Sequence, residues 1–293
     1  MSALTGAGNR DCGRRPRYPL GAMTLMISDT DSDASYGARR EVLLRQLGDL
    51  SNLAVAFSGG VDSSSLLHAA TTVLGDRAVG VIADSASLPR LELHRAQDLA
   101  RDMGARLVVL KTDELELEDY TRNDGLRCYW CKHTLFTRMT AWARAEGFQN
   151  LSFGEITDDA LDDRPGARAA GEFGVIAPLA QAGFSKQDVR RYAREANLVV
   201  HDKPASACLA SRLPRGTGVT AERLARIELA EEGLRSLGLS ILRVRDHGEQ
   251  ARVEVGQNEL EFARGKRPQI EAKLRSAGFA SLELATYIPV AER

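Results

Sequence analysis

The sequence predicts an α/β protein in which helices cover both faces of a parallel sheet, followed by a small C-terminal α+β domain. Two observations carry this prediction. Between residues 53 and 153, short apolar runs suited to buried strands alternate with longer segments of helical periodicity, which is the pattern of a parallel sheet. After a long irregular stretch at 201–218, the pattern changes to two adjacent strands, a helix and a last strand. We therefore expect two domains, at 37–200 and 201–293.

Each element follows from its local pattern. A first helix is expected at 39–50, where apolar residues recur along one side. Buried strands are expected at the apolar runs 53–57, 78–83, 106–110 and 150–153. Helices are expected at 64–73, 91–103 and 134–146, with an irregular loop at 120–132. Beyond them we expect helices at 185–196, 220–237 and 268–276 and strands at 240–245, 251–255 and 281–287.

The composition is that of an ordinary globular protein, with 43% hydrophobic and 27% charged residues and a net charge of −1 over 293 residues. The chain therefore has no excess of basic residues, which a protein that mainly binds nucleic acid would need. No apolar run approaches the length of a membrane span. Four cysteines, unevenly placed, argue against a secreted disulfide framework and favour the cytoplasm. Residues 1–36 have no period and are expected to be a disordered leader, in which Cys12 has no role and Met23 or Met26 is an alternative start.

A glycine loop joins the first strand to the next helix. It contains Ser58, Gly59, Gly60, Asp62 and Ser63. Glycines let the backbone approach a ligand closely, and the first-turn N–H groups of a helix attract an anion, so the loop is expected to bind phosphates. A carboxylate beside phosphates indicates that Asp62 holds a divalent cation such as Mg²⁺. Neither the Walker pattern nor G-x-G-x-x-G occurs here. The alternative is a glycine turn with a helix cap.

S-G-G-x-D-S after a buried strand resembles the PP-loop ATP pyrophosphatase superfamily, which has a Rossmann-like fold. The resemblance implies cleavage of ATP between its α- and β-phosphates. The carboxyl ends of parallel strands meet at one edge of a sheet, and three further features are expected there: Asp84-Ser85, Gly154-Glu155 and the irregular loop at 120–132. Asp84 and Ser85 are expected to approach the adenosine and Gly154 the nucleotide. Asp158 and Asp159 contribute to the Mg²⁺ or substrate site, or else are charges at a helix N-terminus.

Three cysteines lie in two segments predicted near this edge. Cys128 and Cys131 form C-x-x-C, and Cys208 lies in the irregular stretch. A structural zinc ion would need a fourth ligand such as His133 or His201. A [4Fe–4S] cluster held by three thiolates leaves one iron open, and that iron can bind exogenous sulfide. The remaining alternatives are a redox pair or core residues at Cys128 and Cys131, and a lone nucleophile at Cys208.

Several segments, in order, resemble the LarE family of ATP-dependent sulfur transferases, which make the nickel-pincer nucleotide cofactor. The matching segments are NDGLRCYWCKHTLF, FGEITDDALDDRPGARAAGEFGVIAPLAQAGFSKQDVRRYA, DKPASACLASRLPRG and LRVRDHGEQARVE. The match runs from about residue 42 to beyond 255. It implies that the substrate is pyridinium-3,5-biscarboxylic acid mononucleotide. One carboxylate attacks the α-phosphate of ATP, sulfur then displaces AMP from the acyl-adenylate, and the second carboxylate is treated likewise.

The source of the sulfur divides this family. Some members sacrifice the sulfur of a single cysteine, whereas others carry three cysteines that are thought to hold a [4Fe–4S] cluster. Because this chain has Cys128, Cys131 and Cys208, it resembles the second group, with an external sulfide donor. Cys208 is the second residue of the pair Ala207-Cys208, which also favours the cluster over a sacrificial Cys208. Trp130 is expected either to cover the substrate ring or to pack. The family also tends to form homo-oligomers.

The substrate phosphate is assigned to Ser211, Arg212, Arg243 and Arg245. Arg243 and Arg245 alternate along one strand and so face the same side, and paired guanidinium groups suit a phosphate. Glu231 is a candidate catalytic acid or base beside Cys208. The alternatives are a solvated strand face for the arginines and a solvated helix position for Glu231.

Three other functions compete with sulfur transfer to the pyridinium substrate. A tRNA thiolase would combine a PP-loop with similar cysteines, but the net charge of −1 speaks against it. Amide formation, as in NAD or GMP synthetases, would leave the cysteines without a task. A nucleotide-binding module without catalysis would tolerate loss of Asp62, yet the loop is intact.

Overall fold

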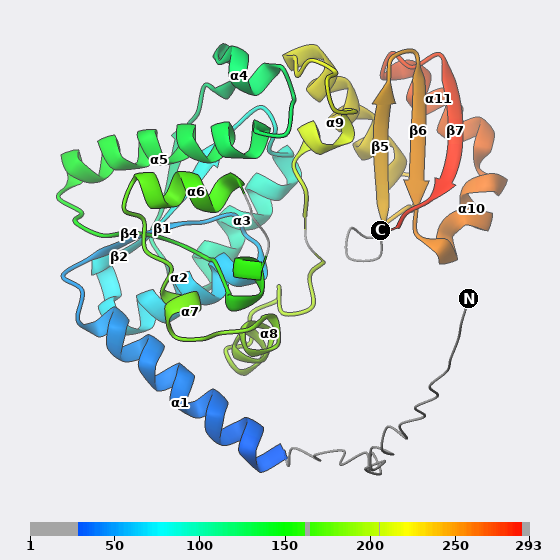
Figure 1. Ribbon diagram of the computed structural model, residues 1–293. Coiled ribbons are helices and arrows are strands. Elements are labelled where there is room, and N and C mark those ends of the chain that lie inside the picture. Colours follow the sequence, from blue (N-terminus) through cyan, green and yellow to red (C-terminus); the bar gives the residue numbers. More distant parts are fainter. Residues whose placement is uncertain (1–28, 162–164, 205, 289–293) are drawn as a thin grey trace, which may run out of the picture.

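The computed structural model describes residues 29–161, 165–204 and 206–288, and these residues form two separate β-sheets (Figure 1). The first sheet has the strand order β3-β2-β1-β4, and all its strands are parallel. Its strands are β1 (Leu53–Ala56), β2 (Ala78–Asp84), β3 (Leu107–Lys111) and β4 (Leu151–Phe153). The predicted parallel sheet is therefore confirmed.

Helices cover both faces of this sheet. Successive side chains of β1 point to opposite faces, and each face packs against helices in its own apolar core. Leu53 and Val55 face a core shared with α1, α2, α3 and α8, whereas Ala54 and Ala56 face one shared with α5 and α6. The helices of this half are α1 (Asp29–Gly48), α2 (Val61–Leu74), α3 (Arg90–Asp102), α4 (Glu118–Thr121), α5 (Arg127–Glu146), α6 (Pro165–Glu172), α7 (Pro178–Gln181) and α8 (Lys186–Glu195). None of the helices in the described ranges is long and apolar enough to cross a membrane.

The second sheet has the order β5-β6-β7, with β5 antiparallel and β7 parallel to β6. Figure 1 shows it on the side of the molecule away from α1. One face packs on helices around a third apolar core, which also takes in Tyr120 from α4. The elements of this half are α9 (Ala221–Arg235), β5 (Leu242–His247), β6 (Gln250–Val255), α10 (Leu260–Gly265), α11 (Arg267–Ser276) and β7 (Ser281–Thr286). Short 3₁₀ helices lie at Gly75–Arg77, Glu114–Glu116, Thr157–Leu161, Leu209–Arg212 and Gln257–Glu259.

Two predicted boundaries are wrong. The predicted leader overlaps helix α1, which begins at Asp29; Tyr36 is buried there, and its hydroxyl donates a hydrogen bond to Glu195 of α8 at 2.9 Å. Residues 1–28, with Cys12, Met23 and Met26, lie outside the described residues. The predicted loop at 120–132 is helical from Arg127 onward, because Arg127 is held by the side chain of Asn123 and the carbonyl of Ala210.

Candidate active site

The glycine loop lies between the end of β1 and the start of α2, as predicted. Gly59 has a φ of +68°, and a Cβ at this position would lie 2.9 Å from the Cβ of Ala96 in α3. Only glycine fits both constraints without strain. No side chain caps the N-terminus of α2 at Gly60. The first-turn amides of α2 therefore remain available to an anion.

Ser58 and Ser63 link the two ends of this loop. The Ser63 hydroxyl accepts a hydrogen bond from the Ser58 amide at 3.2 Å, and the two hydroxyls are 3.1 Å apart. Gly154, at the carboxyl end of β4, touches the same turn: a Cβ there would lie 2.8 Å from the Ser63 nitrogen. Gly154 thus lets β4 approach the start of α2.

Asp62 is paired with Lys186, the first residue of α8. The Lys186 Nζ lies 2.8 Å from each carboxylate oxygen of Asp62. The backbone N–H of Lys186 donates to Asp158 at 2.9 Å, and Asp159 accepts from the Ile156 amide at 3.3 Å. Lys186 was not among the residues predicted from the sequence. A lysine in the first turn of a helix opposes the helix dipole, and this oddity is a signal that could have identified it.

Asp84 and Ser85, at the carboxyl end of β2, are held by Arg90 of α3. Arg90 forms an ion pair with Asp84 and donates to the Ser85 carbonyl. The Ser85 hydroxyl accepts from the Ser87 amide at 3.0 Å, and the Ser87 carbonyl accepts from the amide of Leu209 at 2.8 Å. This edge of the sheet is thereby joined to the residue that follows Cys208.

The three cysteines come from two elements. Cys128 and Cys131 lie in the first turns of α5, and Cys208 is the N-cap of the 3₁₀ helix Leu209–Arg212. All three thiols are free. Cys131, Cys208 and Trp130 pack against the third apolar core. Burial raises the pKa of Cys131 to about 12, with further increases from the buried Glu114 and from Cys208 and Cys128. The three thiols therefore share one electrostatic neighbourhood.

The zinc alternative gains no support from the surroundings of the two histidines. The ring of His133 lies among aromatic rings, 5.6 Å from that of Trp130 and 5.1 Å from that of Phe173, and His201 Nδ1 lies 2.9 Å from Asp202. Across the described ranges, no group of three or more His, Cys, Asp or Glu side chains is placed to hold one metal ion. This finding does not bear on a cluster, because its thiolates bind different irons and so lie further apart.

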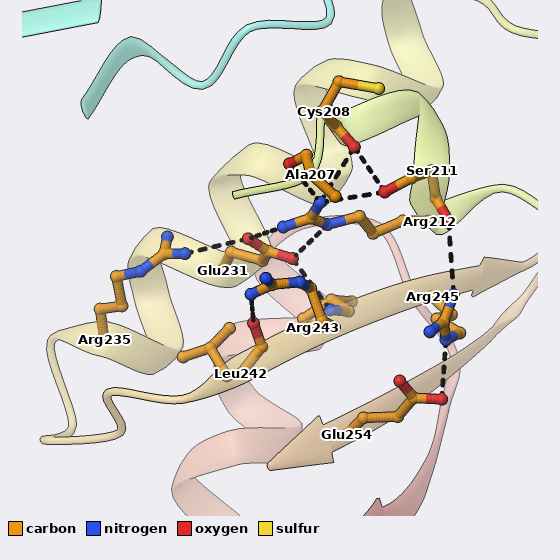
Figure 2. Close-up of polar contacts among 11 residues, drawn as sticks. Ala207, Cys208, Ser211, Arg212, Glu231, Arg235, Leu242, Arg243, Arg245 and Glu254 are labelled. Carbon is orange, nitrogen blue, oxygen red and sulfur yellow. Dashed lines mark hydrogen bonds and ion pairs between the residues drawn. The ribbon is translucent and has the colours of Figure 1, made fainter. Parts of the chain in front are cut away.

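Arg212 is the centre of a buried polar group beside Cys208 (Figure 2). Its guanidinium, 3% exposed, binds both carboxylate oxygens of Glu231, at 2.9 and 3.2 Å. It also donates to the carbonyls of Ala207 at 2.6 Å and Cys208 at 2.9 Å, and to the Ser211 hydroxyl at 3.1 Å. Arg212 therefore holds the backbone carbonyls of Ala207 and Cys208 in place.

Glu231 is 1% exposed, so the alternative of a solvated helix position is wrong. It also accepts hydrogen bonds from Arg235 at 3.0 Å and from the Val244 amide at 3.1 Å. Burial alone would raise the pKa of Glu231, but Arg212, Val244 and Arg235 together outweigh it and lower the pKa below its usual value. A carboxylate stabilised in this way is ionised at neutral pH and a weak base.

Arg243 and Arg245 share one face of β5, as the alternation predicted. Arg243 donates to the Leu242 carbonyl at 2.8 Å and lies 5.1 Å from the ring centroid of Tyr287. Arg245 binds Glu254 at 2.7 Å and reaches the Ser211 carbonyl at 3.3 Å. Burial, followed by the nearby cation of Arg212, lowers the pKa of Arg243. An incoming phosphate would relieve this repulsion.

The structure thus gathers the predicted residues into two groups. Ser211, Arg212, Glu231, Arg243 and Arg245 lie together beside Cys208 (Figure 2). The glycine loop, Asp84, Ser85 and Gly154 lie at the carboxyl ends of β1, β2 and β4, whereas Cys128 and Cys131 lie in α5. Besides Lys186, Lys203 and Glu114 were not predicted; Lys203 lies in the segment DKPASACLASRLPRG, whereas Glu114 belongs to no local motif.

No family model matches the sequence. The chain is 38% identical over 224 residues to an uncharacterized protein of Synechocystis sp., covering 76% of this chain and 84% of that protein. It is 34% identical over 252 residues to the pyridinium-3,5-bisthiocarboxylic acid mononucleotide synthase of Lactiplantibacillus plantarum, covering 86% of this chain and 91% of the synthase. An uncharacterized protein of Methanocaldococcus jannaschii is 29% identical over 228 residues, or 77% and 85% of the two chains. These relatives confirm the family predicted from the motifs: the chain belongs to the LarE family, that of the pyridinium-3,5-bisthiocarboxylic acid mononucleotide synthase.

Proposed function

We propose that this protein is an ATP-dependent sulfur transferase that converts both carboxylates of pyridinium-3,5-biscarboxylic acid mononucleotide into thiocarboxylates, with release of AMP and pyrophosphate. The observation that carries the proposal is the 34% identity, over 86% of the chain, with an enzyme named for the bisthiocarboxylic acid product. The uncapped α2 N-terminus after Gly59 and Gly60 supports a phosphate-binding role for the loop. We also assign the protein to the cytoplasm, which its few, unevenly placed cysteines favour, and to a homo-oligomer, as the family resemblance implies.

ATP is assigned to the carboxyl edge of the parallel sheet. The loop amides and the hydroxyls of Ser58 and Ser63 suit the phosphates, and Asp84 and Ser85 lie at the adjoining strand end. Asp62 supplies carboxylate oxygens suited to Mg²⁺, and its ion pair with the Lys186 ammonium supports the assignment of a cation to this position. Asp62 would hold the Mg²⁺ ion, and Lys186 beside it would supply a second positive charge to the phosphates. Both cations would offset the charge of the departing pyrophosphate.

The pyridinium nucleotide is assigned to the second half of the site. Arg243 and Arg245 present two guanidinium groups on one strand face, and Ser211 and Arg212 adjoin them. Their charge suits the substrate phosphate. Glu231 keeps Arg212 in place by a buried ion pair. We therefore propose that Glu231 acts by positioning Arg212 and Cys208 rather than by transferring a proton.

The sulfur is assigned to the three cysteines. Three free thiols in one electrostatic neighbourhood, backed by an apolar core, suit a [4Fe–4S] cluster on Cys128, Cys131 and Cys208. Such a cluster would supply an open iron that binds sulfide from an external donor. Lys132 opposes the pKa increase of Cys131 and so favours the thiolate form that a ligand must take. The competing proposal is a sacrificial Cys208.

The test is to purify the protein without oxygen, measure iron and acid-labile sulfide, and assay pyrophosphate release with the pyridinium substrate. We expect about four irons per chain, lost when Cys128, Cys131 or Cys208 is changed to Ala but kept in Cys12→Ala. Absence of iron after anaerobic reconstitution would overturn the cluster. Intact mass would then decide for the sacrificial route, through a loss of about 34 Da at Cys208 by β-elimination of the thiol. Pyrophosphate release that needs tRNA or ammonia instead of the pyridinium substrate would overturn the function itself.

A further inference from the structure

Lys203 lies five positions before Cys208 and reaches back to the phosphate loop. Its Nζ donates to the Gly59 carbonyl at 3.2 Å and forms an ion pair with Glu92 of α3 at 2.7 Å. The Lys203 side chain is 21% exposed and that of Glu92 14%. Burial alone would raise the pKa of Glu92, but Lys203 and Arg95 lower it overall, so the Glu92 carboxylate is ionised. One ammonium group therefore joins three elements of the chain.

The contact at Gly59 determines how the loop presents its amide groups. In a trans peptide the C=O and N–H point in opposite directions, and no cis peptide occurs among the described residues. By holding the Gly59 carbonyl, Lys203 turns the Gly60 N–H to the other side of the same peptide. That N–H has a long 3.4 Å contact with the Ser58 hydroxyl, so it remains available to a phosphate oxygen. Gly59 has a positive φ. Glycine adopts this conformation without strain because it has no side chain, so the peptide can take the orientation that Lys203 holds.

The segment that begins at Lys203 is anchored again just after Cys208. The Leu209 amide donates to the carbonyl of Ser87 at 2.8 Å, and Ser87 lies in the turn that follows β2. The Ser87 hydroxyl in turn contacts that of Tyr120 at 2.5 Å. Contacts with the nucleotide half of the molecule therefore lie on both sides of Cys208 in the sequence, at Lys203 and at Leu209.

We infer that Lys203 is a positioning residue that couples the phosphate loop to the Cys208 segment, so that nucleotide bound at the loop fixes the place of the Cys208 thiol. This inference rests on the proposed function, because it takes a nucleotide as the ligand of the loop. Phosphate on the Gly60 N–H stabilises the same peptide orientation that Lys203 holds. Because coupling is reciprocal, loss of the Lys203 contact weakens nucleotide binding and also frees the segment.

The test compares wild type with Lys203→Met, which keeps the length of the side chain but removes its donor. Calorimetry measures the affinity for Mg²⁺ with α,β-methylene-ATP, which cannot be cleaved between its α- and β-phosphates. Hydrogen–deuterium exchange of peptides covering 203–213 is then measured with and without saturating analogue. We expect wild type to gain protection in these peptides. Lys203→Met should bind about tenfold more weakly, the effect of one charged hydrogen bond, and should show no added protection at saturation.

Lys266→Met, at a lysine outside both halves of the site, is the matched control and should behave as wild type. If Lys203→Met does not fold, Lys203→Gln retains a neutral donor and should show an intermediate loss of affinity and protection. Unchanged affinity together with wild-type protection in a folded Lys203 variant would overturn the inference. Failure of wild type to bind the analogue would instead overturn the proposed function, so the two failures are distinguishable.

Discussion

At the scale of single residues, the Arg212–Glu231 pair determines where Cys208 lies. Both side chains are almost completely buried, and a buried charge is tolerated only when it is paired and hydrogen-bonded. Glu231 receives donors from α9, β5 and the 3₁₀ helix that follows Cys208. The pair therefore sets the position of the carbonyl of Cys208 against the second sheet.

Glu231→Gln is expected to lower the free energy of unfolding at pH 7 by about 3 kcal/mol, because Arg212 is left buried without its counter-charge. The folded-state pKa of Glu231 lies below its usual value of 4.5. Its stabilising contribution is therefore present above pH 4.5 and is lost as the pH falls through the folded-state pKa. Urea unfolding of both proteins from pH 7 downward should show the difference shrinking below pH 4.5.

Glu232→Gln, at the exposed neighbouring position, is the control and should change the unfolding free energy little at any pH. A Glu231→Gln difference that stays constant into the acid range would contradict the ionised, paired carboxylate.

At the scale of elements, the sequence was informative wherever one face of an element is apolar. The apolar run of β1 and the helical period of α2 predicted the parallel sheet, and the glycines between them predicted the phosphate loop. Apolar periodicity does not predict the start of α1, because the helix is largely polar between Asp29 and Ser35. This part of α1 is instead held by the hydrogen bond from Tyr36 to Glu195 of α8. Apolar periodicity also fails at Arg127–Lys132, where contacts of Arg127 with Asn123 and Ala210 support the first helical turns.

Alternation along the strand correctly placed Arg243 and Arg245 on one face of β5. The long-range contacts of Lys186 and Lys203 could not be predicted in this way. Lys186 and Asp62 are 124 positions apart, and Lys203 and Gly59 are 144 apart. No periodicity encodes such pairs, because the fold and not the neighbouring sequence brings them together.

Gly154→Ala tests how closely β4 must approach α2. The added Cβ would lie 2.8 Å from the Ser63 nitrogen and 3.0 Å from the Asp62 carbonyl carbon, both of them backbone atoms that cannot rotate away. We expect a loss of about 1–3 kcal/mol in unfolding free energy and weaker binding of Mg²⁺ with α,β-methylene-ATP. Thermal unfolding and calorimetry measure the two effects.

Gly171→Ala in α6 is the matched control, because a Cβ there meets no atom within 4 Å. It should be neutral or stabilising by up to about 1 kcal/mol, since alanine is the better helix former. Equal behaviour of the two variants would show that the close approach at Gly154 is unimportant.

At the scale of the whole molecule, the two halves are joined by the turn after α4. Tyr120 belongs to the core of the second half although it lies far ahead of it in the sequence. Three residues on, Asn123 is 1% exposed and has a φ of +56°. Its side-chain amide donates to the carbonyls of Pro214 at 2.8 Å and Thr217 at 2.9 Å. The same side chain accepts a hydrogen bond from Arg127, which precedes Cys128. The cysteines of α5 and the Cys208 stretch therefore share one support.

Asn123→Ala is expected to lower the free energy of unfolding by about 2–3 kcal/mol, because buried partners lose their hydrogen bonds and alanine is strained at positive φ. Asn197→Ala controls for the strain alone, since Asn197 has a φ of +54° but is exposed at the end of α8. Differential scanning calorimetry should show a broader or split transition for Asn123→Ala, as the second core loses its attachment to the first. The Asn197 variant should keep the wild-type transition shape with a smaller shift. The same loss and shape in both variants would mean that backbone strain, and not the link between the halves, accounts for the effect.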